Sequence, residues 1–141
     1  MKKIIIFFVI VIAIIASVWY IYEQKKISNN NLISNNNQYE QLLNKTISGT
    51  ELTTYINKVI DNNTNNKVEK NSSGIYKDNK KNSISIKIKF IDSDDEIPFE
   101  RIYENDVRRF IKLYGNQDFK CTNIEYHKKT NMIKSLYFEE I

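Results

Sequence analysis

Residues 4–22 form an unbroken apolar run with no charged side chain. As an α-helix these 19 residues would extend about 28 Å, close to the ~30 Å hydrocarbon core of a bilayer. The nearest small-residue motif, Ile14-Ile15-Ala16, has Ile where a signal-peptide cleavage site carries a small residue, and the apolar run continues beyond it. The pattern predicts an uncleaved, single-pass transmembrane helix. A protein that is secreted after signal cleavage is the alternative.

Aromatic and basic side chains follow in the order expected of a membrane–water interface. Aromatic rings favour the headgroup level and lysines extend beyond it. The residues predicted to lie at the membrane interface are Trp19, Tyr20, Tyr22, Lys25 and Lys26.

The flanking charges predict the orientation of the chain. Residues 1–3 carry two lysines and the α-amino group, whereas the two lysines on the far side are offset by Glu23. This imbalance favours a short cytoplasmic N-terminus. Residues 23–37 lack periodicity and are interpreted as an Asn-rich tether, and residues 38–141 as an extracytoplasmic domain.

An amphipathic helix is predicted to begin after Ser48. Ser48 with Glu51 three residues later has the spacing of a capping box. The apolar residues that follow recur with helical period and form one stripe: Leu52, Tyr55, Ile56, Val59 and Ile60. A second amphipathic helix is predicted over residues 99–114, after Pro98, with Gly115 as its stop.

Alternating apolar and polar residues predict strands elsewhere. The clearest is NSISIKIKFI, residues 82–91, and GIYKD, residues 74–78, reads as a shorter one. The C-terminal segments 119–129 and 131–141 predict a hairpin with its turn at Lys129, Thr130 and Asn131. The element order indicates an α+β fold, in which the transmembrane helix precedes a small antiparallel sheet with two amphipathic helices on one face.

The basic charge belongs mainly to the membrane flanks. Of the net charge of +4, residues 1–26 contribute four lysines and one glutamate, a net of +3. Residues 27–141 therefore hold 17 basic and 16 acidic side chains, a net of +1. This balance excludes a pervasive basic surface for nucleic acid. The abundance of Asn, Lys and Ile is interpreted as a product of AT-rich codons.

An acidic run, DSDDE, precedes the second predicted helix. Asp92, Asp94 and Glu96 are candidate calcium ligands, because hard cations bind several carboxylate oxygens. An EF-hand loop starting at Asp92 would need Gly and Glu where Ile97 and Tyr103 stand. The favoured interpretation is that the acids complement a helix N-terminus. A hydrolase that uses Asp94 and Glu96 is a third-ranked hypothesis, and no cofactor is predicted.

Residues 67–89 carry seven lysines against two acids, whereas residues 92–106 carry seven acids against one arginine. The lysines are candidates for binding teichoic or lipid phosphates. The favoured interpretation is a solvated strand edge that the acidic segment partly neutralises.

Cys121 and His127 are the single residues of their types. Six positions apart on one predicted strand, they would be separated by about 20 Å, which excludes a catalytic dyad. One Cys and one His also leave no zinc site in a monomer. Cys121 is interpreted as a small buried residue, with an intermolecular disulfide as the alternative. The oligomeric state stays open.

The apolar N-terminus, ISGTELTTYINKVIDNN and FKCTNIEYHKKTNMIKSLYFEEI resemble a group of uncharacterised small, single-pass membrane-anchored proteins of AT-rich Gram-positive bacteria. The resemblance implies membrane attachment and a compact exported domain, and it supplies no active-site residues. The layout is also similar to that of type IV pilins and pseudopilins. Those proteins have a peptidase site before the apolar segment and a Glu near its start, whereas the first Glu here is Glu23.

The sequence therefore predicts a non-catalytic interaction or structural module in the cell membrane. Its expected partners are the lipid bilayer and a protein that the sequence does not identify. A minor pilin-like or secretion-apparatus subunit is the alternative.

Overall fold

The computed structural model of the chain describes residues 2–104 and 106–141, without the side chains of residues 2, 3, 5 and 27–34. Met1, which belongs to the predicted cytoplasmic segment, lies outside this description. The chain divides into two compact units, Met1–Asn35 and Asn36–Ile141. It is an α+β chain with an apolar N-terminal helix and a five-stranded, mostly antiparallel sheet.

The first unit is helical throughout its described length. Helix α1 (Lys2–Glu40) includes a 21-residue segment, Ile6–Lys26, with a mean hydropathy of 2.3. The helix predicted over residues 4–22 is therefore present, and it is long and apolar enough to cross a membrane. The segment interpreted as an Asn-rich tether is helical, because α1 continues through it to Glu40. Residues 23–37 contain no Gly or Pro, and Asn disfavours a helix only weakly.

The sheet of the second unit has the strand order β1-β4-β5-β2-β3. Its strands are β1 (Thr46–Ser48), β2 (Ser85–Lys89), β3 (Glu96–Pro98), β4 (Asp118–Tyr126) and β5 (Ile133–Glu140). Three neighbouring pairs are antiparallel, but β2 runs parallel to β5 with Ile86 opposite Leu136. The predicted sheet was wholly antiparallel, and this pair corrects it. The chain leaves β2 and returns to its side through β3, two helices and β4, and this long connection permits the parallel arrangement.

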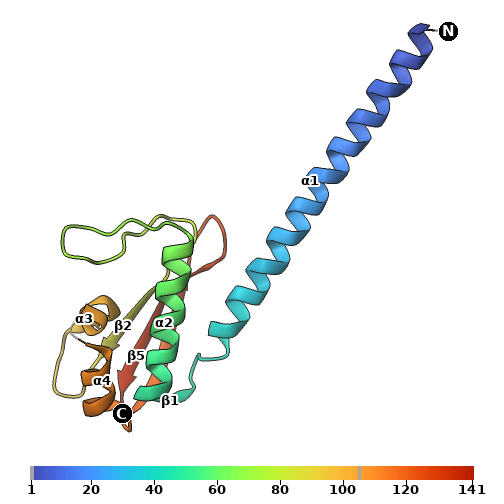
Figure 1. Cartoon of the computed structure of the whole chain (residues 1–141). Coiled ribbons are helices and arrows are strands. Elements are labelled where there is room, and N and C mark those ends of the chain that lie inside the picture. The colour runs from blue at the N-terminus through green and yellow to red at the C-terminus, as the bar shows by residue number, and fades with distance from the viewer. Residues whose placement is uncertain (1, 105) are drawn as a thin grey trace. The chain divides into compact units, whose positions relative to one another are not determined.

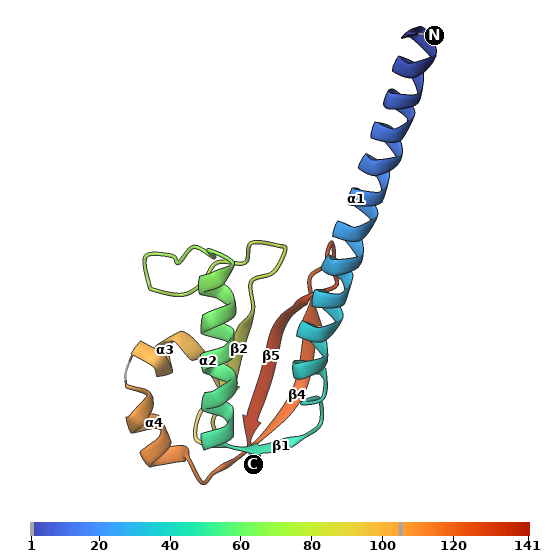
Figure 2. The same ribbon diagram turned by 45° about the vertical axis from the view of Figure 1, so that its right-hand side comes forward.

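Three helices lie on one face of this sheet: α2 (Gly49–Asn65), α3 (Phe99–Glu104) and α4 (Val107–Tyr114) (Figures 1 and 2). The single helix predicted over residues 99–114 is thus two helices. The break occurs at Asp106, whose backbone has a φ of 80° and whose side chain accepts a hydrogen bond from Arg108 N at 2.9 Å. Asp106 acts as the N-cap of α4 and so starts a new helix.

The N-cap and the apolar stripe predicted for helix α2 are confirmed. Ser48 is the N-cap, and its hydroxyl oxygen accepts from Glu51 N at 3.2 Å. Leu52, Ile56 and Val59 of the predicted stripe are fully buried, and Tyr55 is nearly so. The stripe packs on the inward faces of the strands, where the shared core includes Ile86, Ile88, Phe119, Leu136 and Phe138.

The C-terminal hairpin is also confirmed. Strands β4 and β5 pair antiparallel, and Asn131 in the turn has a left-handed φ of 55°. The strand predicted at residues 74–78 is wrong, because Tyr76 forms only an isolated bridge with Lys70. Strands β1 and β3 were not predicted, since three residues are too few to show an alternation.

Two glycines allow helices α2 and α4 to meet closely. A Cβ at Gly49 would collide with the backbone carbonyl of Tyr114. A Cβ at Gly115 would collide with the carbonyl oxygen of Ile111, and would lie 3.0 Å from the hydroxyl oxygen of Thr50. Gly115 ends α4 as predicted, but with right-handed backbone angles, and the missing side chain leaves room for the preceding turn of α4 and for Thr50 of α2.

Candidate functional site

The aromatic residues predicted to lie at the membrane interface sit on α1 with their rings open to the surroundings. Trp19 and Tyr20 are each 67% exposed, and Tyr22 is 63% exposed. Lys25 and Lys26 follow them and are exposed as well. The first unit thus presents an aromatic and basic zone at the end of its apolar segment.

The candidate calcium ligands do not converge. Asp92 and Asp94 are exposed in the loop after β2, whereas the Glu96 carboxylate in β3 lies 3.0 Å from Lys87 Nζ. Within residues 2–104 and 106–141, no group of three His, Cys, Asp or Glu side chains is placed to hold a metal ion. Glu96 instead neutralises a lysine of the neighbouring strand.

The lysines of residues 67–89 are spread over the domain and partly paired. Lys77 forms an ion pair with Glu69 at 3.1 Å, and Lys70 lies over the Tyr76 ring at 4.8 Å from its centroid. The Lys87–Glu96 pair fits the predicted neutralisation by the acidic segment. Exposed pairs of this kind contribute little stability, about 0–1 kcal/mol each.

Cys121 is fully buried in β4, as its sequence context predicted. Burial raises the pKa of its thiol to about 11, against the smaller opposing effect of hydrogen bonds from the backbone of Asn123 and Tyr137. Both features argue against the intermolecular disulfide, because the attacking species in disulfide formation is an accessible thiolate.

His127 lies at the other end of β4, just beyond its last residue, and it is 3% exposed. Its Nε2 is 2.7 Å from the carbonyl oxygen of Ser83. A carbonyl can only accept, so Nε2 carries a proton and the ring donates to Ser83. The other ring nitrogen, Nδ1, lies 3.6 Å from Asp78 Oδ1.

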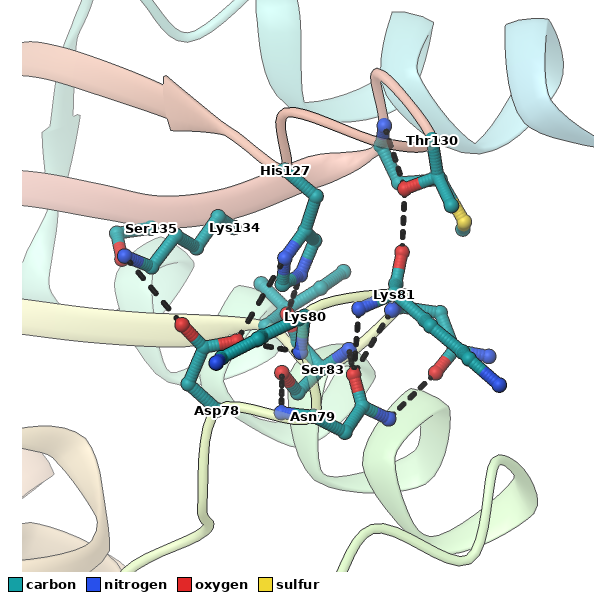
Figure 3. Close-up of polar contacts among 12 residues, drawn as sticks. Asp78, Asn79, Lys80, Lys81, Ser83, His127, Thr130, Lys134 and Ser135 are labelled. Carbon is teal, nitrogen blue, oxygen red and sulfur yellow. Dashed lines mark hydrogen bonds and ion pairs between the residues drawn. The ribbon is translucent and has the colours of Figure 1, made fainter.

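A pocket of about 650 Å³, here called the His127 pocket, surrounds this pair. Its charged lining consists of Asp78, Lys80, Glu125, Lys128, Lys129 and Lys134, and Ile124 and Tyr126 complete its wall. Figure 3 shows Asp78 between His127 and Lys134, with loop 78–83 facing the β4–β5 turn.

Asp78 is held in this pocket by positive partners. Burial acts to raise its pKa, but the hydrogen bond from Lys80 N and the charges of Lys134 and His127 outweigh that effect and leave the pKa below its ordinary value. Lys134 Nζ is 3.5 Å from Asp78 Oδ2 and 4.0 Å from Glu125 Oε2. Asp78 is thus ionised at neutral pH and its carboxylate faces two cation-forming side chains.

Loop 78–83 is tied into a fixed shape by its own side chains. Asn79 Oδ1 accepts hydrogen bonds from the backbone N–H groups of Lys81, Asn82 and Ser83, each at 3.0 Å. Ser83 Oγ accepts from Asn79 N in return, at 3.1 Å. Thr130 donates its hydroxyl to the carbonyl of Lys81, which joins the loop to the β4–β5 turn (Figure 3).

A second hollow of about 450 Å³ lies beside α3 and α4. Its floor is an aromatic cluster, in which the Phe90 and Tyr114 ring centroids are 4.8 Å apart and those of Phe110 and Tyr114 are 5.4 Å apart. Charged side chains of both signs stand at its rim, among them Asp92 and Arg109. It is a shallow apolar surface with a mixed rim.

The sequence did not indicate the His127 pocket, because its walls come from segments about 50 residues apart in the chain. The one available signal was a single histidine followed directly by two lysines, at the end of a predicted strand.

Comparison of the chain with protein-family models, with curated proteins and with solved structures finds no match in any of the three.

Proposed function

We propose that this chain is a single-pass membrane-anchored protein whose extracytoplasmic domain acts as a non-catalytic binding module. The observation that carries the proposal is the exposed apolar surface of α1. Between Ile4 and Tyr22, fourteen large apolar or aromatic side chains are each more than half exposed.

The magnitude of that exposure favours a lipid environment. Burying one large apolar side chain is favourable by about 1.5–3 kcal/mol, so moving all fourteen out of water is favourable by tens of kcal/mol of free energy. A typical domain is stable by only about 5–15 kcal/mol. Exposure of this surface to water would therefore be strongly unfavourable. A bilayer accommodates it, because the side chains are apolar and the backbone groups of the helix are already hydrogen-bonded to one another.

Binding is favoured over catalysis by the state of the reactive side chains. The thiol of Cys121 is buried and its pKa is raised, so it is a poor nucleophile. One ring nitrogen of His127, Nε2, is already engaged in the hydrogen bond to the Ser83 carbonyl. The carboxylate of Glu96 pairs with Lys87 rather than with a second acid.

A pilin-like subunit is the second candidate function. One continuous helix from Lys2 to Glu40 supports it, because an extended N-terminal helix is the element through which such subunits assemble. The position of Glu23, late in the apolar segment, counts against it.

Cysteine labelling in intact cells tests the proposed topology, because the native thiol is buried. The variant Ser72→Cys adds an exposed thiol to the second unit, and a cysteine inserted between Met1 and Lys2, which keeps both lysines, adds one to the N-terminal segment as the matched control. A membrane-impermeant maleimide should label Ser72→Cys in intact cells and the inserted cysteine only after permeabilisation. The opposite pattern would place the domain in the cytoplasm and overturn the proposal.

A further inference from the structure

The positive charge of the folded domain is concentrated in the His127 pocket. The lining contains four lysines and two carboxylates, a net of +2 with His127 neutral. All of residues 27–141 sum to +1, so the remainder of that segment has a net charge of −1. Concave clustering of one sign of charge concentrates counter-ions and ligands of the opposite sign.

Most of these lysines are available to a ligand. Among the ion pairs of the described residues, Lys134 is the only one of the four that takes part, with Asp78 and Glu125. Lys80, Lys128 and Lys129 are exposed at the rim. An anion entering the pocket would therefore meet three ammonium groups that need not first release a carboxylate.

The contacts within the pocket are loose enough to exchange. The Asp78 carboxylate lies 3.6 Å from His127 Nδ1 and 3.5 Å from Lys134 Nζ, both longer than a good charge-assisted hydrogen bond. The His127–Asp78 contact is attractive only when both ring nitrogens carry protons. The buried ring is itself fixed by its 2.7 Å bond to Ser83 O, so Nδ1 has a constant position at the pocket wall.

The walls are preorganised, which reduces the entropy lost on binding. Asn79 satisfies three backbone N–H groups of loop 78–83, and Thr130 and His127 join that loop to the end of β4. Because these backbone N–H groups are already bonded within the loop, the lysine side chains are the groups left to recognise a ligand. Ile124 and Tyr126 add an apolar portion to the wall.

We propose that the His127 pocket binds a phosphate ester, with Lys80, Lys128 and Lys129 contacting the phosphate oxygens and Ile124 and Tyr126 contacting the organic part. A volume of about 650 Å³ exceeds that of a bare phosphate and leaves room for such a group. The assignment rests on the proposed binding function and gives it a ligand class. A lipid headgroup and a soluble phosphate ester share this chemistry.

The single histidine provides a direct test. Its ring carbon–hydrogen signals are the only ones of their kind in the chain, so NMR of the full-length protein in zwitterionic lipid nanodiscs reports on the pocket without assignment. Glycerol phosphate is titrated at constant pH and ionic strength, with chloride as the reference anion. A saturable shift of the His127 signals beyond the chloride response is expected.

A double variant, Lys128→Gln with Lys129→Gln, removes two of the three free ammonium groups. Its affinity for glycerol phosphate should fall at least about tenfold, since hydrogen bonds to charged groups are strong. Lys112→Gln with Lys120→Gln removes the same charge from exposed positions of α4 and β4, and should leave the affinity unchanged. Far-UV circular dichroism and thermal unfolding confirm that both variants fold.

Nanodiscs that contain phosphatidylglycerol distinguish the two ligand sources. Saturation by soluble glycerol phosphate supports a soluble ester, and a shift that occurs only with the anionic lipid supports a headgroup. A response equal to that of chloride in both settings, or equal affinity in the two double variants, would overturn the site. Neither result depends on membrane topology, which the cysteine labelling tests separately.

Discussion

The side-chain amide of Asn63 on α2 pairs with the backbone of Ile84 as a neighbouring strand would. Its Nδ2 donates to Ile84 O at 2.7 Å, and its Oδ1 accepts from Ile84 N at 2.8 Å. Both groups are buried, and they lie 21 residues apart in the chain. Asn63 therefore fixes the end of α2 to the segment that leads into β2.

Replacing Asn63 with Ala should destabilise the protein by about 2–4 kcal/mol, because two buried backbone groups of Ile84 lose their partners. Chemical denaturation followed by circular dichroism measures this change. Asn57→Ala, at an exposed position of the same helix, is the matched control and should change the free energy of unfolding by less than about 0.5 kcal/mol. Equal effects in the two variants would contradict the pairing.

A methyl group at Gly49 should force α2 away from α4. The added Cβ meets the Tyr114 carbonyl, which belongs to backbone and cannot rotate aside. Gly49→Ala is expected to lower the free energy of unfolding by about 1–3 kcal/mol. Thr54→Ala, exposed on α2, serves as the control in the same thermal unfolding experiment. An unchanged melting temperature in Gly49→Ala would show that the helices are not in this close contact.

Glu100 on α3 should make stability fall as the pH rises. Glu100 is 2% exposed, and its Oε2 has no hydrogen-bond partner among the described residues, while Oε1 accepts from Tyr76 N at 3.0 Å. Burial raises its pKa, against the weaker effects of the Glu100 and Tyr76 backbone N–H groups and of Lys70. The folded state therefore binds the proton more tightly than the unfolded state.

The stabilisation from a protonated Glu100 is complete below the ordinary pKa of 4.5 and is lost as the pH rises through the higher folded-state value. Each pKa unit between the folded and the unfolded state corresponds to about 1.4 kcal/mol of stability. Glu100→Gln stays neutral and should be more stable than the native chain at pH 7, with a flatter profile between pH 4.5 and 7. Parallel pH profiles of the two proteins would show that Glu100 is not the group responsible.

Cys121 should be protected from thiol reagents in the folded protein. It is fully buried and its pKa is raised to about 11. Reaction with a thiol-specific reagent at pH 8 is expected to be slow in the native state and to increase by at least about a hundredfold in denaturant. Rapid native labelling, or a reducible dimer on a gel, would show that the thiol reaches the surface.

The elements that the sequence predicted well carry local signals. Helix α2 has its cap at Ser48 and an apolar stripe within a few turns, and the β4–β5 turn contains Asn131, which tolerates the left-handed conformation. The break at Asp106 comes from a local cap with a positive φ, which the apolar pattern does not reveal, and the parallel β2–β5 pair depends on contacts between distant segments. Periodicity alone cannot distinguish one bent amphipathic segment from two helices.

The structural roles of the asparagines also could not be predicted from the sequence. Their abundance was interpreted as codon bias, yet Asn63 pairs with Ile84, and Asn36 donates to Asn131 O and accepts from Ile133 N, 95 and 97 residues further along the chain. A composition count cannot separate such buried asparagines from exposed ones. The His127 pocket was missed for a related reason, because loop 78–83 and the β4–β5 turn meet only in the folded domain.

Membrane attachment through α1 is the central claim, and the intact mass of the protein in carbonate-washed membranes tests it most directly. We expect the full-length chain of 16.7 kDa to remain in the membrane pellet after the alkaline wash. A shorter chain that begins near Ser17 and is free in the medium would show that residues 13–17 contain a cleavage site, and would contradict the anchor.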